Sequence, residues 1–145
     1  MDEIHTPPAG PPQGPPPDPA IYAALGLEGI TRMLQDLYVQ LGRSPIAHLF
    51  PADEAGLKAA GAKSALFFVT VCGGPPLYAQ QHGPPRMRAR HLPFAIDEAA
   101  RRHWLACWEP VLREADVNYG FPAEHLAGFR DFLDGFSAWM VNRCN

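Results

Sequence analysis

The clearest hydrophobic pattern of the chain lies between residues 27 and 41, in the sequence LEGITRMLQDLYVQL. Apolar side chains recur there at intervals of three and four residues, at Leu27, Ile30, Leu34, Leu37, Tyr38 and Leu41. This spacing places them on one face of an α-helix, and Gly42 follows at a position that favours a helix C-terminus. We therefore predict an amphipathic helix over residues 27–41.

The next two segments carry weaker patterns. In SPIAHLFP, Ser44 suits a helix cap and Pro45 a first helical position, so one helical turn is predicted before Pro51. Residues 57–72 (LKAAGAKSALFFVTVC) end in a β-branched and aromatic run that would also suit a strand. The length of this segment, its alanine-rich first half and the Gly-Gly-Pro-Pro stop after it favour a helix that is buried on most sides.

The second half of the chain contains two further helical patterns. Asp97 is a favourable N-cap for a helix that runs to Ala115, and Pro110 should kink or end that helix. Pro122 opens a long helix with a second apolar stripe, which comprises Leu126, Phe129, Leu133, Phe136 and Met140. Because no alternating strand or hairpin pattern accompanies these segments, we predict an all-α fold.

Residues 1–20 have a different composition from the rest of the chain. Eight of these twenty residues are proline, and few of the others are apolar. Such a segment buries too little apolar surface to offset the entropy of ordering, so we expect a disordered or polyproline II tail. Residues 21–145 have the length of one domain with a single hydrophobic core.

The charge balance and the cysteines narrow the range of partners. The chain has 15 acidic and 12 basic residues, and three of the acids lie in the tail, which has no Lys or Arg. The remainder is formally neutral, whereas a nucleic-acid-binding protein normally has a basic excess. Without a long apolar run or a secretory signal, we expect no membrane association and a cytoplasmic location. Cys72, Cys107 and Cys144 are widely spaced, which fits reduced thiols and gives no zinc signature.

One histidine stands apart from the other five. None of the six forms an H-E-x-x-H motif or an i, i+4 pair, so a metal site with several protein ligands is not predicted. His91 lies in RMRARHLPFAI (residues 86–96), among apolar side chains and three arginines. The simplest interpretation is a basic loop before a helix. The alternative is a haem site, which needs one axial ligand, apolar contacts for the plate and cations for two carboxylates.

The residues around His91 resemble a known family. The run GGPPLYAQQHGPPRMRARHLPFAI, together with Trp104, is similar to the second group of truncated haemoglobins in its Gly-Gly-Pro corner and its Arg-His-x-Pro-Phe segment. Upstream, Tyr38 in LYVQL and Phe50 in HLFP resemble two further positions of that family. The similarity extends over residues 20–143. It implies a truncated globin fold, which is a two-over-two helical sandwich around haem.

The resemblance also implies roles for individual residues. His91 would be the proximal ligand to the iron of haem b, iron protoporphyrin IX, and the proline two residues later would end its short helix. Tyr38 and Trp104 would donate hydrogen bonds to a ligand on the opposite, distal side. Ser64 stands where the family often has Leu or Gln. Its hydroxyl would either donate to the ligand or bond the carbonyl of Ala60 in its own helix.

The expected haem-binding surface combines apolar and basic side chains. Its members are Phe50, Ala60, Phe67, Met87, Arg88, Arg90 and Phe94. Arg88 and Arg90 are preferred to Arg86 as partners of the haem propionates, because a guanidinium binds a carboxylate through two parallel hydrogen bonds. Solvated arginines beside disordered propionates are the alternative.

Three functional hypotheses follow. The first is a haem protein that binds dioxygen, carbon monoxide and nitric oxide, and serves oxygen transport, storage or sensing. The second is a redox enzyme at the same iron, active in nitric oxide dioxygenation or peroxidase-like oxidation and served by a reductase. The third drops haem and leaves a helical interaction module. We favour the first, and the sequence permits either a monomer or a homodimer.

Overall fold

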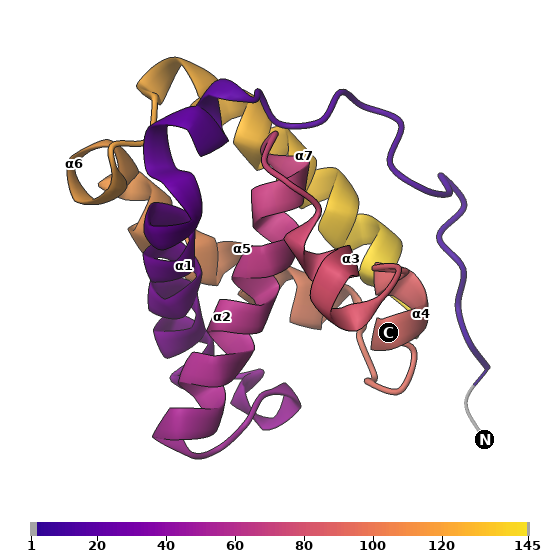
Figure 1. Ribbon diagram of the computed structural model, residues 1–145. Coiled ribbons are helices and arrows are strands. Elements are labelled where there is room, and N and C mark those ends of the chain that lie inside the picture. The colour runs from indigo at the N-terminus through magenta and orange to yellow at the C-terminus, as the bar shows by residue number, and fades with distance from the viewer. Residues whose placement is uncertain (1–2, 145) are drawn as a thin grey trace.

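The computed structural model describes residues 3–144, and every regular element in that range is a helix (Figure 1). The all-α prediction is therefore confirmed for this part of the chain. In chain order the elements are α1 (Ala20–Gly42), η1 (Ala47–Leu49), α2 (Glu54–Val71), α3 (Leu77–His82), α4 (Met87–His91), α5 (Glu98–Arg113), α6 (Ala115–Tyr119), η2 (Ala123–His125) and α7 (Leu126–Met140). Of the helices in residues 3–144, none is both long enough and apolar enough to cross a lipid bilayer.

The first helix consists of two parts that meet at Gly26. The backbone angles of Gly26, φ 65° and ψ −177°, are essentially restricted to glycine. The predicted amphipathic helix is the part after this break, and its apolar face is fully buried at Ile30, Leu34 and Leu41. Leu27 was expected on the same face, but it is 44% exposed because it lies in the first turn after the break.

The second helix packs along the first (Figure 1). It begins directly after Asp53, whose carboxylate accepts a hydrogen bond from the backbone N–H of Gly56 at 2.8 Å. The helical interpretation of residues 57–72 is confirmed, and this cap extends the helix toward the N-terminus. A Cβ atom at Gly61 would lie 3.2 Å from the Cα of Gln35, so glycine allows α1 and α2 to approach closely.

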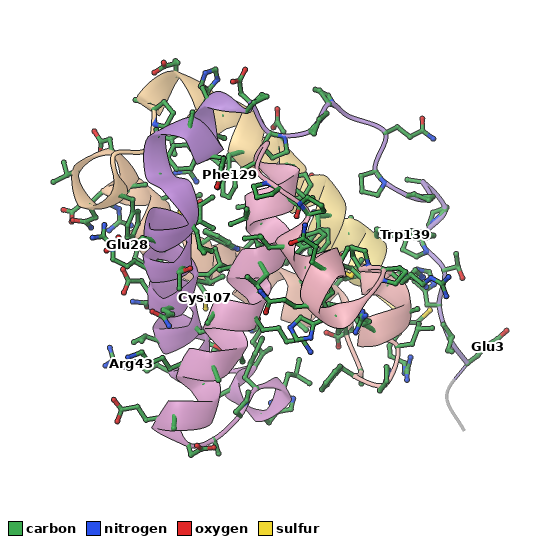
Figure 2. All side chains as sticks on the ribbon, in the orientation of Figure 1. Glu3, Glu28, Arg43, Cys107, Phe129 and Trp139 are labelled. Atoms are coloured by element: carbon green, nitrogen blue, oxygen red, sulfur yellow. The ribbon has the colours of Figure 1, made fainter. Side chains whose placement is uncertain are left out.

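A second pair of helices, α5 and α7, completes the core. Asp97 caps α5 as predicted, since its carboxylate accepts from the N–H of Ala100 at 2.8 Å. Pro110 does not end α5, which continues to Arg113 because the residues that follow the proline are buried in the core. The rings of Trp108 on α5 and Phe129 on α7 lie 5.5 Å apart and are almost fully buried. Figure 2 shows Phe129 in the interior and Glu28 on the outer side of α1.

The corner after α2 is built from two glycines. Gly73 has a φ of 98°, in the left-handed region that favours glycine. A Cβ atom at Gly74 would lie 2.6 Å from Cγ1 of Val69 and 2.7 Å from the ring of Tyr22. This corner therefore holds the start of α1 against the end of α2. Beyond it come the two short helices α3 and α4, which are too short to give a periodic pattern. The family resemblance alone implied a short helix at His91.

The N-terminal segment, residues 3–19, contains no helix or strand and runs beside α7 (Figure 1). A Cβ atom at Gly135 of α7 would lie 3.6 Å from Pro12. The backbone N–H of His5 donates to the carbonyl of Asn142 at 2.9 Å, and Pro17 is buried. The disorder expected for residues 1–20 stays a prediction, although the described part of the segment makes specific contacts with the end of the chain.

Candidate functional site

A cavity of about 490 Å³ lies among α1, η1, α2, α4, α5 and α7. Aromatic and aliphatic side chains form most of its wall, as is usual for a ligand pocket. Of the side chains predicted for the site, those that line the cavity are Tyr38, Phe50, Ala60, Ser64, Phe67, Met87, Arg90, His91, Phe94 and Trp104. Arg88 is absent from the wall. Ten of the eleven predicted side chains thus come together from separate parts of the chain.

His91 is the last residue of α4, and its imidazole is in the electronic state that a metal ligand requires. Its Nδ1 lies 2.6 Å from the carbonyl oxygen of Met87, which can only accept, so Nδ1 carries the proton. Burial lowers the pKa of His91, and the Met87 hydrogen bond opposes this only in part. The ring is therefore neutral at pH 7 with an unshared electron pair on Nε2. A histidine that ligates a metal typically donates its other N–H to a backbone carbonyl in this way.

Tyr38 and Ser64 form a polar pair in an otherwise apolar part of the wall. Tyr38 comes from α1 and Ser64 from α2, and their side chains are hydrogen-bonded to each other. Burial raises the pKa of Tyr38, and the Ser64 hydrogen bond opposes this to a smaller extent. The phenol is thus protonated and able to donate. Its ring meets Phe50 edge to face, with the centroids 5.5 Å apart.

The sequence left the hydrogen-bond partner of Ser64 open, with a bound ligand and the carbonyl of Ala60 as the two alternatives. The structure shows a third arrangement, in which the hydroxyl of Ser64 pairs with Tyr38 across the interface of α1 and α2. Sequence spacing within one helix could not show this contact, because it depends on how two helices are aligned.

Trp104 lies on α5 and contributes to the same wall. Its ring contacts Trp108 in an edge-to-face arrangement at 6.0 Å and Phe136 of α7 at 6.2 Å. Phe136 and Met140 of α7 also line the cavity, together with Ile96 and Ala100. Sequence reasoning missed Phe136, Met140 and Ala100 as site residues, and it counted Ile96 only among the apolar side chains around His91. The signal was present for Phe136 and Met140, because they belong to the apolar stripe of the last predicted helix, but that stripe was assigned to the core.

The basic residues at the cavity differ from those expected. Arg90 borders it, but its guanidinium donates to the carbonyls of His82, Pro84 and Pro85 and stacks over the ring of Tyr78. Arg90 thus also fixes the turn between α3 and α4. Two basic residues that were not predicted, Lys63 of α2 and Arg101 of α5, line the cavity as well.

The environments of these two cations differ. The Arg101 guanidinium is largely buried and donates to Glu98, Asp134 and Ser137. Lys63 is exposed, so a solvent-accessible cation borders the cavity. A lysine in the alanine-rich first half of a helix gave no sequence signal for a site, because lysines are mostly exposed.

Arg88 does not line the cavity, so its expected contact with a propionate stays a prediction that this geometry does not favour. Its guanidinium donates to the carbonyls of Trp139, Val141 and His5, and stacks over the Trp139 ring at 4.5 Å. Figure 2 shows Trp139 on the side of α7 that faces the N-terminal segment. The physical reason is that three carbonyls, at the end of α7 and in the N-terminal segment, accept hydrogen bonds from three of the five N–H groups of Arg88.

Comparison with known proteins decides the family. The profile of the bacterial-like globins matches residues 20–137. The chain belongs to this family. Group 2 truncated hemoglobin YjbI of Bacillus subtilis is 34% identical to this globin over 117 residues, which are 80% of each chain. The predicted resemblance to the second group of truncated haemoglobins is confirmed.

Solved structures support the same assignment. Hell's gate globin IV superposes on this globin with a TM-score of 0.83 and 36% sequence identity, over 92% of this chain and 81% of the other. The truncated oxygen-avid haemoglobin of Bacillus subtilis superposes with a TM-score of 0.73 and 31% identity, over 83% of this chain and 98% of the other. The truncated globin fold is thereby confirmed, and the chain is a member of a haem protein family.

The residues of this cavity fit a haem. Its wall is predominantly apolar and aromatic, and it contains a neutral imidazole whose second nitrogen has no proton. In residues 3–144 there is no group of three His, Cys, Asp or Glu side chains that could hold a bare metal ion. A single histidine in an apolar cavity has the donor set of an axial haem ligand.

Proposed function

We propose that this globin binds haem b through His91 and uses it to bind dioxygen reversibly, for oxygen transport or storage. The observation that carries the proposal is the hydrogen bond from Nδ1 of His91 to Met87, which leaves Nε2 as the metal-binding atom at the wall of the cavity. The Bacillus subtilis relative described as oxygen-avid supports the choice of ligand.

Several side chains would hold the cofactor beside His91. Phe50, Ala60, Phe67, Met87 and Phe94 supply apolar contacts, and each of them lines the cavity. For the propionates we replace Arg88 by Lys63, which is exposed at the cavity, and retain Arg90. Haem would supply an iron with one open position for dioxygen, carbon monoxide or nitric oxide.

The distal residues would select and retain the ligand. Tyr38 is protonated, and Trp104 is an obligate donor, so both offer hydrogen bonds to a ligand that carries partial negative charge. Ser64 would orient the hydroxyl of Tyr38, because the two side chains are hydrogen-bonded. Ser64 thus acts through Tyr38 in this proposal.

The proximal ligand can be tested by titration with hemin. We expect His91→Ala to weaken haem binding by more than the roughly 10–100-fold that loss of a neighbouring partner causes, because the iron loses its protein ligand. His48→Ala is the matched control, since His48 is exposed and does not line the cavity. Retention of wild-type ferric, ferrous and carbonyl spectra by His91→Ala would assign the iron to another residue.

The distal donors can be tested by the rate of dioxygen release. We expect Tyr38→Phe and Trp104→Phe each to speed release by about tenfold, the equivalent of about one hydrogen bond. Phe132→Leu is a suitable control, because Phe132 packs on the core without lining the cavity. Unchanged release rates in both distal variants would remove the two donors from the mechanism.

The second candidate function is redox turnover, either nitric oxide dioxygenation or peroxidase-like oxidation. The Tyr38–Ser64 pair and Trp104 favour it, because several hydrogen-bonding groups predict slow ligand release, which suits a reactive site better than a carrier. The distinguishing experiment adds nitric oxide to the oxygenated protein with a reductase present. Sustained nitrate formation would indicate an enzyme, and a single turnover would favour the carrier.

A further inference from the structure

The segment that carries His91 cannot hold its own conformation. The helix α4 has five residues, far fewer than an isolated helix needs, and none of residues 86–99 is buried. Within the protein, Ile96 is the residue of this segment that packs against the hydrophobic core. Specific hydrogen bonds to the rest of the protein therefore make a large contribution to the conformation of the segment.

Asn142, just after α7, supplies four of those bonds. Its side-chain N–H groups donate to the carbonyl of His91 at 3.1 Å and to that of Phe94 at 2.9 Å. Its side-chain oxygen accepts from the N–H of Ile96 at 3.0 Å, and its backbone N–H donates to the carbonyl of Ile96 at 2.9 Å. Asn142 is 0% exposed, so these contacts are shielded from water.

We propose that Asn142 is a positioning residue that fixes the orientation of the proximal histidine. The proposal rests on the proposed function in that it takes His91 as the axial ligand. The carbonyl of His91 is held by Asn142, and the Nδ1 of its ring is held by the carbonyl of Met87 one turn earlier. Backbone and ring are thus held at separate points, which restricts the direction of Nε2.

Only an asparagine meets the chemical requirements of this position. The segment presents two carbonyls and one N–H, and the Asn side chain has two donor hydrogens and one acceptor oxygen on a short stem. An aspartate would retain the acceptor for Ile96 but lose both donors and place a charge beside two carbonyl oxygens. An alanine would remove the side-chain partners of the Phe94 carbonyl and the Ile96 N–H, and would leave the His91 carbonyl with only the N–H of Phe94.

A second layer of contacts holds Asn142 itself. Its carbonyl accepts from the N–H of His5 at 2.9 Å and from the guanidinium of Arg143 at 2.9 Å. Arg88, on α4, joins the carbonyls of Val141 and His5. The N-terminal segment therefore contacts the proximal helix through Arg88 and contacts Asn142 through its backbone, so it supports the position of both.

The test compares Asn142→Asp and Asn142→Ser with Asp53→Ala. Asp53 caps α2, so its replacement lowers stability without touching residues 87–96. The first measurement is amide hydrogen exchange of Leu92 and Phe94 in the full chain as purified. We expect exchange about tenfold faster in the Asn142 variants than in the control. Asn142→Ser removes the amide without burying a charge, so it provides the measurement even where Asn142→Asp does not fold.

The second measurement is the iron–histidine stretching band of the ferrous, hemin-loaded protein. We expect a shifted or broadened band in the Asn142 variants and an unchanged band in Asp53→Ala. Exchange at the control rate would overturn the proposal, and so would faster exchange with a wild-type band, because Asn142 would then have only a structural role. Absence of the band from the wild-type protein would instead refute the axial role of His91, and the exchange rates would still decide whether Asn142 holds the segment.

Discussion

The distal and proximal walls of the cavity are built by different means. The distal wall consists of long helices, α1, α2 and α5, whose buried apolar faces pack in the core. The proximal wall contains the five-residue α4 and an irregular segment, and none of residues 86–99 is buried. There the backbone is held by side chains that donate to carbonyls, from Arg88, Arg90 and Asn142.

This contrast shows that the two walls depend on different features of the sequence. A packed helix depends on many similar contacts, so its stability falls gradually as apolar surface is lost. The proximal segment depends on a few polar side chains, each of which satisfies several backbone groups. We therefore expect core substitutions to lower global stability, and substitutions on the proximal side to change local order around the histidine.

The largest effect should come from Phe129→Ala in the core beneath the distal wall. Phe129 is 0% exposed and contacts the rings of Trp108 and Phe121. Its truncation would leave a cavity and lower the free energy of unfolding by about 3–5 kcal/mol. Urea denaturation measures this loss. The Soret spectrum of the folded protein should stay unchanged, and an altered spectrum would contradict the separation of the two walls.

Arg88→Met should have an intermediate effect that is confined to the proximal side. Methionine keeps much of the apolar stem but removes the donors to Trp139, Val141 and His5. We expect a loss of about 1–3 kcal/mol that is already present without hemin, because these contacts do not involve the cavity. Arg86→Met is the control for loss of charge. A loss that occurs only with hemin bound would restore Arg88 as a propionate partner.

Asp97 lies at the junction between the proximal segment and α5, a helix that lines the cavity. Its carboxylate accepts from Ala100, so Asp97→Ala should lower the free energy of unfolding by about 1 kcal/mol. Asp97→Asn should recover most of this, because asparagine caps a helix N-terminus about as well. Thermal unfolding of the two variants provides the measurement. Equal losses in both would assign the effect to the charge of Asp97 rather than to its hydrogen bond.

The smallest effect on stability is expected from Tyr119, a residue that lines neither wall of the cavity. Burial first, and then the hydrogen bond to Asp36 and its charge, raise the pKa of Tyr119, which Arg32 partly opposes. The folded state therefore binds its proton more tightly than the unfolded state, whose tyrosine has a pKa of 10.0. Stability should fall as the pH rises above that value, and less steeply in Tyr119→Phe. Urea denaturation at several alkaline pH values would show the difference, and parallel slopes would contradict it.

The long helices could be predicted from the sequence because their determinants are local. The periodic apolar residues of α1 and the cap at Asp97 depend on spacing within one element, and the structure confirms both. Local preference is ambiguous where tertiary packing decides. The sequence predicted a helix to Ala115 that Pro110 would kink or end, and α5 continues past the proline to Arg113, with Val111 and Leu112 buried in the core.

The candidate site could be predicted only in part, and mainly through the family resemblance. That resemblance assigned His91, Tyr38 and Trp104 to one haem pocket, and all three line the same cavity. Arg88 was expected at the pocket but does not line it, because the carbonyls that attract it come from the two ends of the chain. Asn142 was missed altogether, since an asparagine near the end of the chain has no distinctive spacing and its partners lie about fifty positions away.

The glycine corner after α2 restricts how this sequence can evolve. At position 74 even a methyl group would collide with Val69 and with Tyr22, so a library randomised at that codon should return glycine almost alone. Position 73 is constrained twice, by its backbone angle and by Pro19 at 2.6 Å. Substitution of either glycine would therefore require neighbouring atoms or the backbone to shift, although both positions lie outside the cavity.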